Sequence, residues 1–229
     1  MRRTVRLSPA GTQLVRDALG SKLMLGFVIV SGIYYGLLFV SNILDRSALS
    51  LGLISILSQG FVTAESIILY QRKESRNLKH LSVFCLIGMI VMLALSVFLG
   101  AVVLTLNMEY SAKTEEIMQL WAENNMESSM PSMIATVAAA GVSGIEMLFL
   151  WKALGMCANI MEHRDTSMRN WFLPAAVVSG LYAVMTLAMA VIWPGSAAGV
   201  FSSLVCVARD GLLTALLIRA ARDYGAKVR

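Results

Sequence analysis

Long uninterrupted stretches of apolar residues dominate the chain, and each is long enough to cross a lipid bilayer as a helix. A helix rises about 1.5 Å per residue and the hydrocarbon core is about 30 Å thick, so a span needs about 20 residues. This pattern predicts an all-α membrane protein with a single domain over residues 1–229. Its six transmembrane helices are expected at about 23–44, 48–70, 81–106, 131–151, 171–193 and 200–218.

Composition excludes several other classes of protein. Hydrophobic residues make up 57% of the 229 residues and charged residues only 14%. Soluble domains average about 45–50% apolar and about 25% charged residues. A soluble enzyme, a disordered regulator and a fibrous repeat are therefore excluded, and the lipid bilayer is the expected surrounding of the chain.

The basic residues predict the orientation of the helices. Of the 19 Lys and Arg, 16 lie in the two tails and in the loops that follow the second and fourth predicted spans. Only Arg46 and Lys113 lie on the opposite side, and Arg209 lies within a span. Cytoplasmic loops carry the excess of Lys and Arg, so both termini are expected in the cytoplasm. The same bias explains the net charge of +5 without a nucleic-acid partner.

The six spans are expected to form three consecutive helical hairpins, each an uncharged helix followed by a helix that carries one acid. The first and fifth spans share a short match, Val-Ser-Gly-Ile-Tyr at 30–34 and Val-Ser-Gly-Leu-Tyr at 178–182. Internal repeats are common in transporters. Convergent composition explains the match equally well, so the repeat stays open.

Two segments outside the spans are expected to lie on the membrane surface. The segment 7–21 is modestly amphipathic, with Leu14, Val15 and Leu19 as its apolar residues. The acidic outer loop 107–130 places Ile117, Leu120 and Trp121 at helical spacing. An amphipathic helix of this kind lies with its apolar face in the interface.

Four ionisable residues fall inside predicted spans: Glu65, Glu146, Arg209 and Asp210. A charge at the centre of a transmembrane helix costs about 2.5–3.5 kcal/mol, so such residues mark candidate functional sites. The three acids are candidate ligands or carriers for a proton or cation in a shared cavity. Alternatively, Arg209 neutralises one acid of another helix, and the other acids reach the cytoplasmic headgroups. Adjacent helix residues point about 100° apart, so Arg209 and Asp210 are not expected to face each other.

A further candidate contact is the face that carries Gly32 and Gly36, which matches the GxxxG packing pattern of membrane helices. We expect it to serve packing within the chain, with contact to a second copy or to other membrane subunits as the alternative.

No metal-ligand, phosphate-loop or nucleophile–base pattern is present in the sequence, and we identify no motif specific to a known family. Neither an enzyme nor a cofactor is therefore expected. The expected function is transport: a small ion- or proton-coupled carrier, or the membrane subunit of a larger transporter, in a bacterial plasma membrane. The alternative is a non-catalytic scaffold, sensor or immunity-type protein that acts through helix contacts.

Overall fold

A computed structural model describes residues 4–5, 9–44, 49–111, 126–164, 166–167, 169–193 and 197–228. Two short strands, β1 (Thr4–Val5) and β2 (Thr166–Ser167), pair antiparallel. The remaining elements are helices: α1 (Pro9–Leu19), α2 (Lys22–Leu44), α3 (Leu49–Arg72), α4 (Ser75–Ser111), α6 (Met126–Met161), α7 (Phe172–Ile192) and α8 (Ala197–Val228).

Each of the six apolar stretches is helical, and several helices continue well beyond the stretch that predicts them. The helix predicted to begin at residue 81 begins at Ser75, and the one predicted to end at residue 151 continues to Met161. A helix satisfies its own backbone hydrogen bonds, so it can project out of the apolar layer without a break. In the part of the chain that the structure describes, α2, α4, α6, α7 and α8 are long and apolar enough to span a membrane. The chain is a helical protein with several candidate membrane spans.

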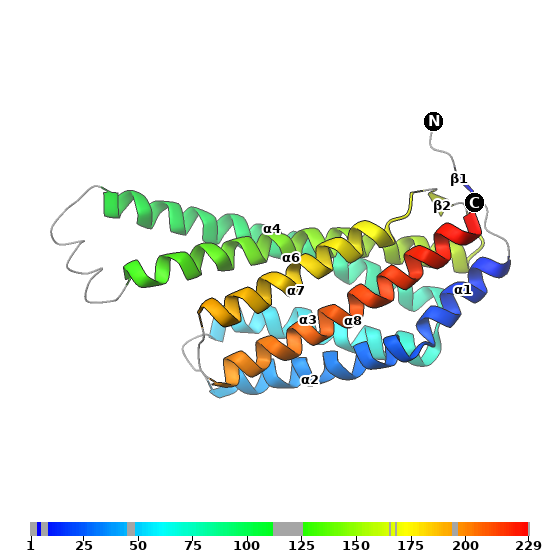
Figure 1. Cartoon of the computed structure of the whole chain (residues 1–229), viewed down its shortest axis with the longest axis horizontal. Helices are drawn as coiled ribbons and strands as arrows, with labels where there is room; N and C mark the ends of the chain where they lie inside the picture. Colours follow the sequence, from blue (N-terminus) through cyan, green and yellow to red (C-terminus); the bar gives the residue numbers. More distant parts are fainter. Residues whose placement is uncertain are drawn as a thin grey trace.

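The six long helices form a ring in which each helix packs against its neighbours in sequence. Helix α2 contacts α3, α3 contacts α4, and the order continues through α6, α7 and α8, which closes the ring by packing against α2. The helices run side by side along the long axis of the molecule, with α1 and the end of α8 at the same end (Figure 1). We call this the α1 end. Away from it, large apolar side chains such as Val97, Phe98 and Val191 are exposed on the outside of the ring, which is what a lipid-facing surface requires.

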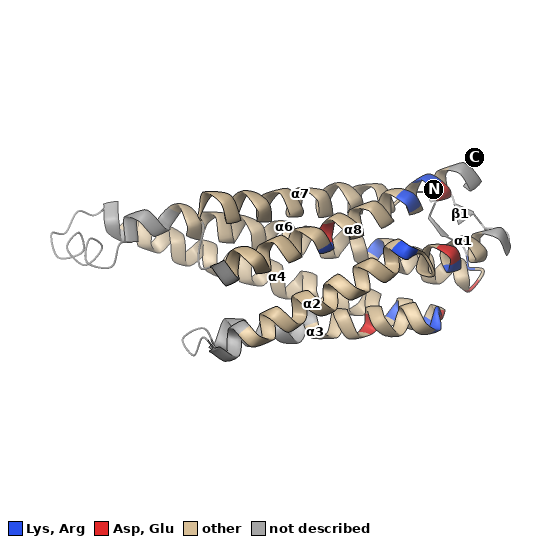
Figure 2. Cartoon of the chain, turned by 60° about the horizontal axis from the view of Figure 1, so that its bottom comes forward, with Lys and Arg blue, Asp and Glu red and all other residues tan. Residues whose placement is uncertain are grey.

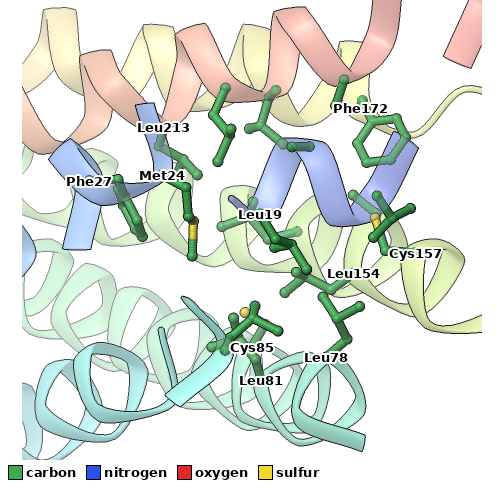
Figure 3. A pocket seen from close by; sticks show the side chains of 18 of the residues that line it. Leu19, Met24, Phe27, Leu78, Leu81, Cys85, Leu154, Cys157, Phe172 and Leu213 are labelled. Carbon is green, nitrogen blue, oxygen red and sulfur yellow. The ribbon is translucent and has the colours of Figure 1, made fainter. Parts of the chain in front are cut away.

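Helix α1 does not lie on the surface, as its amphipathic pattern predicted, because it packs against α6 and α8 at the α1 end. Its apolar residues Val15 and Leu19 are buried in the main apolar core of the protein. That core closes around a cavity of about 120 Å³ whose lining comes from α1 and from all six helices of the ring. Leu19 points into this inner cavity with Leu78, Leu154 and Leu213 (Figure 3). Helix α1 therefore plugs the ring at one end.

Close helix contacts occur at glycines other than the predicted pair. A Cβ added at Gly32 or Gly36 would meet nothing within 4 Å, so the expected packing of this face within the chain was wrong for the residues that the structure describes. At Gly144 of α6, by contrast, an added Cβ would lie 2.8 Å from Leu93 Cγ on α4. The surface carrying Gly32 and Gly36 is left open, so contact with a second copy or another subunit stays a prediction.

The predicted surface helix around Trp121 lies outside the described residues. Helix α4 continues to Ser111 and helix α6 begins at Met126, so both ends of the predicted loop 107–130 are helical.

Candidate functional site

The core of the site is an ion pair between two adjacent residues of α8. Arg209 donates from Nε to Asp210 Oδ1 at 2.8 Å, and its second nitrogen Nη2 lies 2.7 Å from the same oxygen. Asp210 is fully buried, and the Arg209 side chain is 11% exposed. The prediction that these two side chains do not face each other was wrong, because a long arginine side chain can fold back along its own helix.

Two more groups lie beside the ion pair. The other oxygen of Asp210, Oδ2, lies 3.5 Å from Cys206 Sγ, one turn earlier on α8. The Arg209 guanidinium carbon lies 4.7 Å from the ring centre of Tyr34 on α2. A guanidinium over a ring face gains a favourable cation–π interaction, which is stronger where water is excluded. The positive charge is thus held by a carboxylate and an aromatic ring.

A second carboxylate, Glu146 of α6, lies close to the pair. Its side chain is 3% exposed, and its electrostatic neighbours include Asp210, Arg209 and the Ser179 hydroxyl of α7. Tyr182, one turn after Ser179, is a neighbour of the same three charged groups and of Cys206. We call Tyr34, Glu146, Tyr182, Cys206, Arg209 and Asp210 the buried charge cluster. With every group ionised except the tyrosines and the cysteine, its net charge is −1.

Figure 2 shows that many of the charged residues of the described chain gather at the α1 end. Arg209 and Asp210 lie near the middle of α8, away from that end. In the described part of the chain, no group of three His, Cys, Asp or Glu side chains is arranged to hold a metal ion. The buried charge cluster offers a second carboxylate, Glu146, beside the Arg209–Asp210 ion pair.

The structure brings together three of the four sequence-predicted residues and leaves the fourth apart. Glu146, Arg209 and Asp210 are mutual neighbours, whereas Glu65 of α3 is not among the main electrostatic neighbours of any of them. Its Oε2 atom is buried without a hydrogen-bond partner among the described residues. Glu65 thus belongs to a separate environment.

Sequence reasoning missed the tyrosines and serines of the site, although it found the segments that carry them. The matched pentapeptides of α2 and α7 each contribute a tyrosine to the buried charge cluster, Tyr34 and Tyr182. Ser31 and Ser179, three residues before each tyrosine, are both buried. Helices α2 and α7 flank α8 on its two sides. The matched pentapeptides could therefore have predicted these residues, because each places a serine and a tyrosine three residues apart on a helix that packs against α8.

A vestibule of about 310 Å³ opens at the end of the bundle opposite α1, between α6, α7 and α8. These are the helices that carry Glu146, Tyr182 and the ion pair. Its polar lining includes Thr136 and Ser203. Ser203 lies seven residues before Asp210 on the same face of α8, about 10 Å along the helix. Small buried side chains, Ala140 and Ser143 of α6 and Ala183 of α7, lie between the two levels.

Comparisons with models of protein families, with curated proteins and with solved structures found no match to this chain.

Proposed function

We propose that the protein is a six-span plasma-membrane protein with its α1 end in the cytoplasm and a role in transport rather than in catalysis. The orientation is supported by the excess of Lys and Arg in the segments expected at that end. Transport is proposed either for the chain alone or for the chain as a membrane subunit of a larger transporter.

The observation that carries the transport proposal is the excess negative charge of the buried charge cluster. Arg209 and Asp210 neutralise each other through two short contacts, which leaves Glu146 as a second buried carboxylate without a cation of its own. An uncompensated charge at this depth is unfavourable, so Glu146 gains by binding a proton or a small cation. A group that must take up a cation to be stable inside the membrane is suited to carry one across it.

The vestibule supports a route from one side to Glu146. It ends on the same three helices as the cluster, and the hydroxyls of Thr136 and Ser203 replace part of the hydration of an entering cation. Deeper in the ring, the hydroxyls of Ser179 and Tyr182 lie near the carboxylates. This series of oxygen atoms fits a proton or a small monovalent cation better than a large organic substrate.

The test is flux in proteoliposomes with three matched variants. Glu146→Gln keeps the shape of the side chain and removes its charge, so we expect a folded protein without proton, Na⁺ or K⁺ flux. Glu65→Gln makes the same chemical change outside the cluster and is expected to keep the flux of the parent. Asp210→Asn is expected to abolish flux, because it leaves Arg209 to neutralise Glu146 instead.

Absence of flux of all three cations in the folded parent protein would overturn the proposal that the chain alone transports a cation. The scaffold alternative would then be favoured if Glu146→Gln is also as stable as the parent. Equal loss of flux in Glu65→Gln and Glu146→Gln would place the carrier site elsewhere than in the buried charge cluster.

A further inference from the structure

A second site of different chemistry lies at the α1 end. A hollow of about 520 Å³ opens between α1, the turn from α3 to α4 and the last residue of α6. Four of its lining side chains are basic and one is acidic. The residues are Arg16, Arg72, Lys73, Glu74, Ser75, Arg76 and Met161, and we call this hollow the basic pocket.

The turn between α3 and α4 holds the basic residues around the pocket. Lys73 has a φ of 49°, in the left-handed region, and its amide donates to Leu69 O at 2.9 Å, which ends α3. Helix α4 begins two residues later, so Arg72 and Arg76 stand on either side of the reversal. The Lys73 ammonium packs over Gly20, where an added Cβ would lie 2.8 Å from Nζ. The turn and the end of α1 are therefore fixed against each other.

The positive charge of the basic pocket is not neutralised within the described part of the chain. Two nearby basic residues do have a partner: Lys79 Nζ lies 2.6 Å from Glu162 Oε1, and Arg164 Nε lies 3.0 Å from Glu162 Oε2. The hydrogen bond from Lys79 lowers the pKa of Glu162 below its usual value, so this group stays ionised. Arg16, Arg72 and Arg76 form no such ion pair with any described carboxylate. Among the described residues, the pocket therefore offers three guanidinium groups without an ion-pair partner to an anion.

The surroundings of the basic pocket favour an amphipathic anion over a free one. The inner cavity lies between the same helices, and Leu69 of its lining stands one turn before Arg72 on α3. Aromatic rings at this end carry basic side chains on their faces: Lys152 Nζ lies 3.8 Å from the Trp151 ring centre, and the Arg169 guanidinium 4.3 Å from that of Trp171. Such pairs are typical of the headgroup level of a bilayer. Basic pockets at helix ends on the cytoplasmic side bind lipid phosphates.

We propose that the basic pocket binds the phosphate headgroup of an anionic phospholipid of the leaflet at the α1 end. The guanidinium groups of Arg72 and Arg76 hold the phosphate oxygens, since a guanidinium donates two parallel hydrogen bonds to such an anion. Arg16 of α1 contacts the same phosphate from the other side of the pocket. This site is separate from the buried charge cluster and does not depend on transport.

The experiment compares two variants of equal charge change in nanodiscs of phosphatidylglycerol or phosphatidylcholine. Arg72→Gln/Arg76→Gln removes two charges from the pocket. Arg219→Gln/Arg222→Gln removes two exposed charges from α8 outside it. Native mass spectrometry measures bound phosphatidylglycerol, and thermal unfolding in each lipid measures its effect on stability. We expect the pocket variant to bind phosphatidylglycerol at least tenfold more weakly and the α8 variant to bind it within twofold of the parent.

A gain-of-binding variant keeps the test decisive if the pocket variant does not fold. Glu74→Gln removes the one acid among the described residues that line the basic pocket, so this variant is expected to retain more phosphatidylglycerol than the parent. An equal loss in both double variants would show general attraction of a basic surface, and it would overturn the proposal. Inorganic phosphate is added to the protein in phosphatidylcholine discs as a further control. If it stabilises the protein as much as phosphatidylglycerol does, the lipid proposal is overturned in favour of a free anion. Unchanged binding in Glu74→Gln together with unchanged binding in the pocket variant would place the lipid elsewhere.

Discussion

At the scale of single residues, the sequence position of a charged residue predicts its burial in the buried charge cluster, but not which residue it pairs with. The apolar stretches around Glu146, Arg209 and Asp210 predicted their burial, because no water reaches the interior of a packed span. Their pairing needed more than the direction of each Cα–Cβ bond. Four bonds separate the Cβ of arginine from its guanidinium carbon, and that length lets Arg209 reach the neighbouring Asp210. Which acids meet is decided by the ring, since Glu146 and Glu65 are alike in sequence context but lie on helices with different neighbours.

Breaking the ion pair on one side should be more harmful than removing it altogether. Arg209→Gln leaves Asp210 and Glu146 buried without their cation, so we expect the free energy of unfolding to fall by about 3–5 kcal/mol. Arg209→Gln/Asp210→Asn removes both charges and should recover most of that loss. Chemical unfolding in detergent measures the two values. Equal stability of Arg209→Gln and the parent would contradict the burial of this pair.

At the scale of helices, the length of an apolar stretch predicts that a helix exists but not where it ends or what it contacts. Helices α4, α6 and α8 continue past the predicted limits, because leaving the bilayer does not break backbone hydrogen bonds. Helix α1 was predicted with the correct apolar face and the wrong location. An apolar face of this kind can be buried against lipid or against protein. Helix α1 is buried against protein because the ring of helices leaves room for it at one end, and the sequence of α1 does not indicate this.

The short match between α2 and α7 illustrates the same limit. Its tyrosines reach a common cluster, but its glycines differ in their contacts. A Cβ added at Gly180 would touch Thr214 of α8 at 3.7 Å, whereas one at Gly32 would touch nothing within 4 Å. Helices α2 and α7 thus carry a similar polar face, but their matched glycines do not make similar helix contacts.

Glycine substitutions should separate the close helix contact from the open surface. Gly144→Ala forces a methyl group against Leu93 Cγ and Cδ2, both 2.8 Å away, so we expect a loss of about 1–3 kcal/mol in the free energy of unfolding. Gly32→Ala serves as the matched control in open space. It should be neutral or stabilising by up to about 1 kcal/mol, because alanine favours a helix over glycine. A loss at Gly32 equal to that at Gly144 would indicate a contact between copies of the chain.

At the scale of the whole molecule, the sequential order of the ring gives the chain a simple path back and forth between its two ends. Each helix packs against the next, and α8 returns to α2. Alternating direction was predictable from the short connections between spans. Closure of the ring was not, because no pattern within α2 or α8 indicates that the first and last helices meet.

The proposed orientation predicts the outcome of reporter fusions. A reporter that is active only in the cytoplasm should give a signal when fused after Lys79 or after Arg229, and no signal when inserted at Asn125. Expression of each fusion is checked by immunoblot of the membrane fraction. A signal at Asn125 together with none at Arg229 would reverse the orientation, and a signal at all three positions would contradict the six-span arrangement.

The plug formed by α1 has an electrical consequence. In the proposed transport route a cation enters from the vestibule, whereas α1 and the apolar core lie on the other side of the buried charge cluster. A membrane potential falls mainly across the layer that excludes water, which the proposed route places between Glu146 and the α1 end. One elementary charge that crosses the full potential exchanges about 2.3 kcal/mol per 100 mV. A cation would therefore reach Glu146 from the vestibule almost independently of voltage, and its passage beyond α1 would carry nearly all of the voltage dependence.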